Sequence, residues 1–279
     1  MILKSFSKIN LTLDVISKLK KRKLHNIQSY FCLIDLYDQI HIKKIKRQKD
    51  RIKFKGKFLN KINNKNNSIL DTLQILRKNN FLNNHYSIVV NKRIPVFGGM
   101  GGGTGNAACL VKYLVKKKIS KKVMNTLNDK IGSDFNLFFC KQGFLQNIKT
   151  IIKLKKNFKF YFLLVYPNKK CSTKFIYSQV RKYSSLKKYN SQLINTRSKF
   201  LDYLISHNND LQSIVETRYP IIKKLIKEIQ QIKGCYFSRI TGSGAVCYGI
   251  FKSKKTVKNA LNLIRLKYPK YWSSIAKTI

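Results

Sequence analysis

The residues that most clearly point to chemistry form a glycine-rich run between positions 95 and 108. Six of the thirteen glycines of the chain fall within eight residues of this run. Alternating residues over 85–91 predict a half-buried strand before it. Helical spacing after it is set by Ala107, Leu110, Val111 and Leu114. Such a turn exposes backbone N–H groups at a helix start, where anions are favoured, so the run predicts a phosphate-binding loop rather than a linker.

The loop does not fit the common phosphate-binding patterns. A P-loop ends in Gly-Lys-Ser/Thr, and this run contains no lysine. The dinucleotide pattern needs glycines at relative positions one, three and six, but the sixth residue is Thr104 from Gly99 and Asn106 from Gly101. Protein kinases would add His-Arg-Asp and Asp-Phe-Gly elements, which the sequence lacks. The loop therefore indicates another class of phosphate-binding protein.

Asp134 and Lys8 are candidates for proton and charge chemistry. Asp134 is one of only 11 acidic residues, and it lies beside glycine at the start of an apolar run. Because a buried carboxylate is costly unless paired, this position favours either catalysis or a helix N-cap. A carboxylate beside a hydroxyl can accept its proton during attack on phosphorus, and a nearby ammonium would keep the carboxylate ionised. Lys8 is one of 48 lysines, and spacing alone leaves it equally a solvated surface charge.

Composition indicates a folded basic protein. The chain has 279 residues, with 43% hydrophobic and 12% aromatic residues, enough for one large core or two modest ones. The net charge of +47 would ordinarily suggest nucleic acid. The basic residues are spread along the chain and only 10 are Arg, the residue best suited to bidentate readout. Coding bias towards Lys, Asn and Ile accounts for this pattern, so no nucleic-acid partner is expected.

Cysteine and histidine spacing predicts neither a metal site nor export. The six cysteines never lie within three residues of one another, which favours free core thiols in a reducing cytoplasm. The four histidines form no metal motif. No apolar stretch reaches the roughly 20 residues of a membrane span, and the N-terminus enters a strand pattern without a signal-like core. We therefore expect a cytoplasmic protein without a membrane partner.

Hydrophobic periodicity predicts two α+β domains. Strands are expected at 9–15, 31–42, 160–165, 235–240 and 245–251. Helices are expected over 69–76, 222–229 and 257–264, with a loop at 61–67 and a strand or buried helix at 135–140. Rising charge after residue 149 places a boundary between domains 1–152 and 153–279. The α-β-β-α order of the second half favours a ferredoxin-like module.

The glycine run and five further groups of residues resemble the GHMP small-molecule kinases, in family order. The run is similar to Pro-x-x-Gly-Gly-Leu-Gly-Gly-Gly-Ser-Ser-Asn-Ala-Ala, and Ser7-Lys8-Ile9-Asn10-Leu11 to the family's opening Ala-Lys-Leu-Asn-Leu. Gly132-Ser133-Asp134 resembles Gly-Ala-Asp, and Thr241-Gly242-Ser243-Gly244-Ala245 matches a late turn. Further matches are Asn209-Asp210-Leu211 and the segment from Pro167 through Ser172-Thr173 to Tyr177.

The resemblance implies a two-domain fold, with a ribosomal protein S5 domain 2-like N-terminal domain that binds ATP and a ferredoxin-like C-terminal domain. It implies transfer of the ATP γ-phosphoryl to a small-molecule alcohol, with Lys8 and Asp134 catalytic. The triple-glycine loop is most similar to members whose acceptor is a cytidyl diphosphate ester of a sugar alcohol. His25 and Tyr177 would bind that acceptor. Mg²⁺ would come with ATP, near Thr104 and without a direct metal motif, in a monomer or homodimer. The ATP-binding residues implied are Pro95, Val96, Phe97, Gly98, Gly99, Met100, Gly101, Gly102, Gly103, Thr104 and Gly105.

Four departures from the family pattern affect the expected site, one of which is Phe97 in place of a glycine of the loop. Leu24 stands where the family has an aromatic residue that stacks on the base, Gly105 replaces a serine, and Asn136 replaces a proline. None removes a reacting group. Two alternatives remain open at this point: another kinase of the family, of homoserine or mevalonate type, and a basic RNA-associated protein without enzymatic activity.

Overall fold

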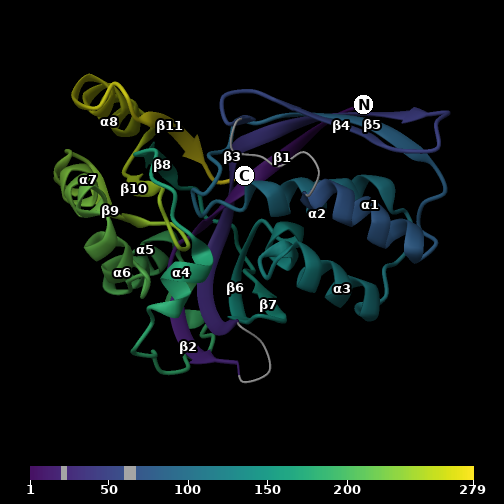
Figure 1. Ribbon diagram of the computed structural model, residues 1–279. Coiled ribbons are helices and arrows are strands. Elements are labelled where there is room, and N and C mark those ends of the chain that lie inside the picture. Colours follow the sequence, from purple (N-terminus) through teal and green to yellow (C-terminus); the bar gives the residue numbers. More distant parts are fainter. Residues whose placement is uncertain (20–23, 60–66) are drawn as a thin grey trace. The chain divides into compact units, whose positions relative to one another are not determined.

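The computed structural model describes residues 1–19, 24–59 and 67–279 (Figure 1). Their contacts group into two compact units. Unit 1 comprises 1–8, 36–96 and 101–139, and unit 2 comprises 9–35, 97–100 and 140–279. Strands β1 (Ile2–Asn10) and β3 (His25–Ile45) contribute residues to both units, so the units are not continuous in sequence. A linear boundary at residue 152 stays a prediction, and most of the loop expected at 61–67 lies outside the described residues.

Unit 1 is built on the C-terminal half of β3. Gln39–Ile45 pairs antiparallel with β5 (His85–Asn91), and β5 pairs parallel with β4 (Arg51–Lys55). Alternation along these strands buries Ile40, Ile42, Ile88 and Val90. The charged residues of β4 are exposed, as is usual for an edge strand that must not pair with another chain.

Helices α1, α2 and α3 and the short 3₁₀ helix η2 form the helical part of unit 1 in the described residues. Helix α1 (Ser68–Lys78) is capped by the Asn67 side chain, which accepts hydrogen bonds from the N–H groups of residues 69 and 70. It contacts α2 (Gly102–Leu114) and α3 (Lys121–Ile131), and α2 also contacts η2 (Phe135–Phe139). Figure 1 shows α1, α2 and α3 as neighbours. The apolar stretch after Asp134 is therefore a 3₁₀ helix.

The first sheet region of unit 2 surrounds the N-terminal half of β3. This half pairs antiparallel with β2 (Asp14–Lys18) and β6 (Gln142–Asn147), and β6 pairs with β7 (Thr150–Lys153). The single strand expected over 9–15 is interrupted between β1 and β2, because the N–H groups of Leu11 and Thr12 both donate to the Tyr30 carbonyl. Continuous alternation of apolar residues concealed this break.

A four-stranded antiparallel sheet forms the rest of the unit 2 core. Its order is β11 (Trp272–Lys277), β8 (Tyr161–Tyr166), β10 (Cys247–Phe251) and β9 (Cys235–Ile240). Helices α7 (Pro220–Gln231) and α8 (Lys254–Lys267) pack their apolar faces on it (Figure 1). The chain order β8, α7, β9, β10, α8, β11 is the ferredoxin-like arrangement that the sequence predicts.

Between β8 and α7 the chain forms short elements with a long irregular connection. They are α4 (Thr173–Ser178), η3 (Gln192–Ile194), α5 (Arg197–Ser206) and α6 (Gln212–Arg218). Residues 180–190, between α4 and η3, adopt neither helix nor strand. Side-chain hydrogen bonds hold this connection, which is important for the site in unit 2.

Candidate active site

The N-terminus of α2 is formed by the glycine-rich run and is open to a ligand. Gly101 is the N-cap, with a left-handed φ of 67°, and no side chain caps it. The N–H groups of the first helical turn therefore lack the usual capping acceptor. A Cβ placed on Gly103 would meet nothing closer than the Ser68 hydroxyl at 3.5 Å. Bare backbone at a helix N-terminus is suited to binding phosphate oxygens.

Phe138 of η2 packs against two glycines of α2. A Cβ on Gly101 would lie 2.8 Å from the Phe138 ring, and a Cβ on Gly105 would lie 2.9 Å from it. Gly101 and Gly105 are four residues apart and so face the same side of the helix. The glycine that replaces the family's second serine thus makes room for Phe138, which brings η2 and the Asp134 turn against the start of α2.

Lys8 and Asp134 meet beside this helix start. Lys8 comes from β1 and is 3% exposed, and its Nζ lies 3.0 Å from Oδ2 of Asp134, which is 28% exposed. The Lys8 side chain passes Gly101, since a Cβ there would lie 3.4 Å from Lys8 Cγ. The Thr104 hydroxyl would lie 3.6 Å from a Cβ on Gly132, just before Asp134. Unit 1 therefore places an ion-paired carboxylate, partly open to solvent, beside a helix N-terminus.

A second Lys–Asp pair lies behind the loop and is closed to solvent. Lys92 and Asp38 are 3% and 0% exposed and form an ion pair. Asp38 Oδ1 also accepts the backbone N–H groups of Arg93 at 2.8 Å and Ile94 at 2.9 Å, just before the glycine run. In the amide orientation that satisfies its neighbours, Asn106 donates to Asp38 at 3.2 Å and to the Gly102 carbonyl. Asn106 thus braces the loop from inside unit 1.

Residues 97–100 of the run are fastened to the late turn within unit 2. The Phe97 carbonyl accepts from Ala245 N–H at 3.2 Å, and a Cβ on Gly99 would lie 2.2 Å from the Thr241 carbonyl oxygen. The Thr241 hydroxyl accepts the Asn10 N–H at 3.0 Å. The two sequence motifs are therefore in contact, and Gly99 is required for that approach.

The two residues predicted to bind the acceptor also meet within unit 2. The rings of His25 and Tyr177 are stacked, with centroids 5.2 Å apart and an interplanar angle of 28°. Tyr183 lies on the same histidine at 6.3 Å and is 46% exposed. Burial, with a smaller contribution from the charge of Lys18, lowers the pKa of His25. Arg22 and Lys23, which precede Leu24 and His25 in the sequence, lie outside the described residues.

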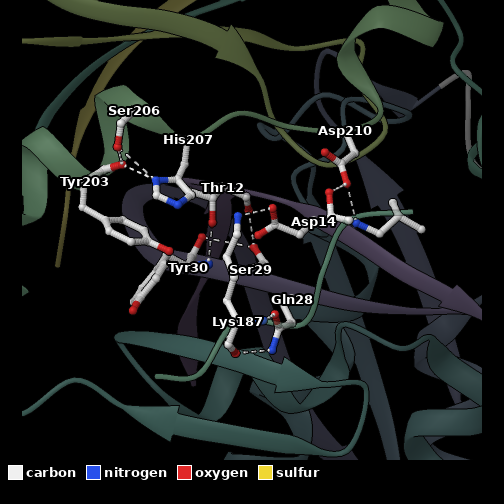
Figure 2. Close-up of polar contacts among 12 residues, drawn as sticks. Thr12, Asp14, Gln28, Ser29, Tyr30, Lys187, Tyr203, Ser206, His207 and Asp210 are labelled. Carbon is white, nitrogen blue, oxygen red and sulfur yellow. Dashed lines mark hydrogen bonds and ion pairs between the residues drawn. The ribbon is translucent and has the colours of Figure 1, made fainter. Parts of the chain in front are cut away.

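Sequence reasoning missed a polar cluster around Asp14 in unit 2 (Figure 2). Lys187 Nζ lies 2.6 Å from Asp14 Oδ1, and Asp210 Oδ2 accepts the Val15 N–H at 2.7 Å. Burial raises the pKa of Asp14, while Lys187 opposes that rise. The side chain of His207 stacks on Tyr203, with ring centroids 3.8 Å apart. Asp210 carried a signal, as part of Asn209-Asp210-Leu211, but nothing local identified Asp14 or Lys187.

The described residues contain no group of three His, Cys, Asp or Glu side chains able to hold a metal ion. All six cysteines are free thiols, as predicted. Burial raises the pKa of Cys109 to about 11, so this thiol is unsuited to nucleophilic chemistry. Within the part of the chain that is described, no helix has the length and apolar character to cross a membrane.

The fold and one sequence region match the GHMP kinases. Residues 200–270 match the family model described as GHMP kinases C terminal. The structure superposes on a 4-(cytidine 5'-diphospho)-2C-methyl-D-erythritol kinase with a TM-score of 0.76, covering 99% of both chains at 17% identity. A homoserine kinase from Cytophaga hutchinsonii gives a TM-score of 0.69 at 12% identity, covering 100% of this chain and 94% of the other. The architecture is therefore that of the GHMP kinases.

Full-length relatives define the family more narrowly. The chain is 36% identical to the 4-diphosphocytidyl-2-C-methyl-D-erythritol kinase of Pelagibacter ubique over 284 residues, covering 99% of this chain and 98% of the relative. It is 29% identical to the enzyme of that name from Wolbachia pipientis wMel, covering 96% and 95%. The chain belongs to the family of 4-diphosphocytidyl-2-C-methyl-D-erythritol kinases. The predicted small-molecule kinase class is thereby confirmed.

Proposed function

We propose that this protein transfers the γ-phosphoryl group of ATP to the 2-hydroxyl of 4-diphosphocytidyl-2-C-methyl-D-erythritol, in the cytoplasm and as a step of isoprenoid precursor synthesis. The names of full-length relatives supply the substrate. The observation that carries the chemistry is the Lys8–Asp134 pair beside the open N-terminus of α2. A general base, a cation and a phosphate-binding helix start in one compact unit suit phosphoryl transfer.

The proposed step uses Asp134 as the base. Its carboxylate accepts the proton of the acceptor hydroxyl while the hydroxyl oxygen bonds to the γ-phosphorus of ATP. The bond from that phosphorus to the β–γ bridging oxygen breaks, and ADP leaves with the bonding electrons. Lys8 is buried and fixed, so its ammonium lies ready to stabilise the negative charge on the transferring oxygens. Partial exposure of Asp134 leaves it accessible to the acceptor.

The residues at the start of α2 fit ATP phosphates. Gly101 has no side-chain cap, and a Cβ on Gly103 would meet nothing closer than the Ser68 hydroxyl at 3.5 Å. We infer that the N–H groups of residues 102–104 bind phosphate oxygens, since the Gly105 N–H already donates to the Gly101 carbonyl at 2.7 Å. Gly102 and Gly103 have no side chain to hold the nucleotide away. The Thr104 hydroxyl lies beside Gly132, and we infer that it would meet a Mg²⁺ bound to those phosphates. That ion would neutralise phosphate charge during transfer.

The acceptor's cytidine portion is assigned to His25 and Tyr177. Nδ1 of His25 is buried and makes no hydrogen bond in the described structure, so it can serve a polar ligand. The Tyr177 ring offers a flat face next to it. An aromatic surface beside an unused ring nitrogen suits a nucleobase, which presents a π face and a hydrogen-bonding edge.

An acceptor panel tests the function. Purified protein is incubated with ATP and Mg²⁺ and, separately, 4-diphosphocytidyl-2-C-methyl-D-erythritol, homoserine or mevalonate, and the phosphorylated product is identified by phosphorus NMR. We expect one new phosphomonoester signal, with the cytidyl acceptor alone. Product formed from homoserine or mevalonate instead would replace the proposed substrate. Salt-dependent RNA binding without phosphoryl transfer to any acceptor would contradict the kinase function itself.

A further inference from the structure

Residues 180–190 of unit 2, which we call the strap, are held down at Lys187. The Gln28 side chain bonds the Lys187 backbone twice: its oxygen accepts the N–H at 2.8 Å and its nitrogen donates to the carbonyl at 2.9 Å. Figure 2 shows the Lys187 side chain running from this point to Asp14, where Nζ lies 2.6 Å from Oδ1. An irregular segment must satisfy its backbone through such contacts, and this one does so against β2 and β3.

A second anchor lies three residues earlier in the strap. Ser184 donates its N–H to the Val15 carbonyl at 2.8 Å and its hydroxyl to Asp210 Oδ2 at 2.7 Å. Asp210 Oδ2 also accepts the Val15 N–H at 2.7 Å, so one carboxylate ties the strap to the β2 backbone. The strap is therefore fixed at both ends of the short stretch 184–187 by hydrogen bonds to β2 and β3.

The anchored stretch directly follows Tyr183. Tyr183 lies 6.3 Å from His25, ring centre to ring centre, and is 46% exposed. Tyr177, in helix α4 just before the strap, stacks on the same histidine. Leu24, which precedes His25, is 40% exposed and offers no π face. A half-exposed tyrosine held by a neighbouring anchor is a ready contact surface for a flat ligand.

The ion pair between Lys187 and Asp14, which we call the latch, joins a side chain of the strap to β2. Asp14 is 6% exposed, and burial raises its pKa, so its charged form depends on Lys187. Asp210 is the like charge facing it, and His207 and Tyr203 are the other titratable groups near it. Without Lys187 the buried carboxylate would lose its cation, and the strap would lose the contact that crosses 173 positions of sequence.

We propose that the strap is a specificity element of the acceptor site, in which the Lys187–Asp14 latch holds Tyr183 as an aromatic face for the nucleobase of the acceptor. This assignment rests on the proposed function. Tyr183 contacts the base, whereas Lys187 and Asp14 act through the strap and are positioning residues. The ATP phosphates, assigned to residues of unit 1, do not depend on the latch.

Kinetics with varied acceptor and varied ATP test this assignment. Lys187→Met and Tyr183→Ala should each raise the KM for the cytidyl acceptor roughly 2- to 10-fold, the scale of one lost aromatic contact, and leave the KM for ATP unchanged. The double variant should have an acceptor KM no higher than that of the more strongly affected single variant, because both substitutions remove the same contact. Tyr183→Phe keeps the aromatic ring and should therefore retain the wild-type KM for the acceptor. Lys188→Met, on the exposed neighbouring side chain, is the matched control and should match wild type.

Hydrogen exchange separates failure of the strap from failure of the proposed function. Without any ligand, the Ser184 and Lys187 amides should be protected in the wild type and exchange faster in Lys187→Met. If the amides respond but the acceptor KM does not, the strap exists and its role in specificity is wrong. If the amides exchange freely in the wild type, the latch itself is wrong. If the amides are protected but the wild type transfers no phosphoryl group to the cytidyl acceptor, the proposed function is wrong and the strap remains.

Discussion

Unit 1 contains two Lys–Asp ion pairs that are alike in residue type, and we propose that one is structural and the other catalytic. In Lys92–Asp38 both partners are buried, and Asp38 also accepts two backbone N–H groups. In Lys8–Asp134 the lysine is equally buried, but the carboxylate is 28% exposed. A saturated carboxylate can only hold structure, whereas a carboxylate with one cation and an open side can still accept a proton. We therefore propose that saturation, rather than residue type, separates the structural carboxylate of Asp38 from the catalytic one of Asp134.

The largest effect is expected at the open pair. Asp134→Asn keeps the shape but cannot accept the proton, so turnover should fall about 10²–10⁴-fold while acceptor and ATP affinities change little. Lys8→Ala should also lower turnover, and the double variant should be far from additive because both residues serve one step. Single-turnover phosphoryl transfer measures this.

Asp129→Asn, on an exposed carboxylate of α3, is the matched control for that experiment. It should keep the wild-type rate. A near-wild-type rate in Asp134→Asn would show that the partly exposed carboxylate is not the base. The two ion pairs would then differ in burial but not in catalytic role.

The closed pair should affect stability instead. Lys92→Met leaves Asp38 buried without its cation, which should lower the free energy of unfolding by about 3–5 kcal/mol. Lys130→Met is the control, since its Nζ lies 3.5 Å from Asp71 on a side chain that is 59% exposed, and it should cost at most about 1 kcal/mol. Urea unfolding of both variants measures the difference. Equal losses would mean that burial does not distinguish these ion pairs.

The packing of Phe138 against Gly105, which brings the Asp134 turn to α2, gives a smaller effect. Gly105→Ala would place a Cβ 2.9 Å from the Phe138 ring and 3.1 Å from the Phe6 carbonyl, and should destabilise the fold by about 1–3 kcal/mol. Gly103→Ala, with 3.5 Å of space, should be neutral or gain up to about 1 kcal/mol from helix propensity. Thermal unfolding of the two variants measures the difference in stability. Equal values would show that Phe138 does not require glycine at position 105.

The smallest effect concerns the polar cluster of unit 2. Burial lowers the pKa of His207. The folded state then binds a proton less readily than the unfolded state, so stability falls as the pH drops below the ordinary histidine value of about 6.5. His207→Gln should therefore lose less free energy of unfolding than the wild type between about pH 7.5 and about pH 5.5. A larger loss in the variant would reverse the sign and contradict burial as the cause.

Local pattern predicted much of the fold because each element shows its own periodicity. Apolar spacing marked α1, α7 and α8, alternation marked β5, and short apolar segments marked β8 and β9. Pattern failed where a contact from elsewhere decided the backbone. The strand expected over 9–15 breaks because Leu11 and Thr12 both bond Tyr30, and the run after Asp134 is a 3₁₀ helix whose Phe138 packs against Gly105 of α2.

The sequence by itself determined the glycine-rich helix start and, through resemblance, the choice of Lys8, Asp134, His25 and Tyr177. These signals are short runs whose residue types state their chemistry. Only the tertiary structure decided which carboxylates are saturated and which irregular segment is fastened. Asp38 and Lys92 are 54 positions apart, and Asp14 and Lys187 are 173 apart. Pairing at such separations leaves no local periodicity, because it depends on how the strands bring distant side chains together and how deeply they bury them.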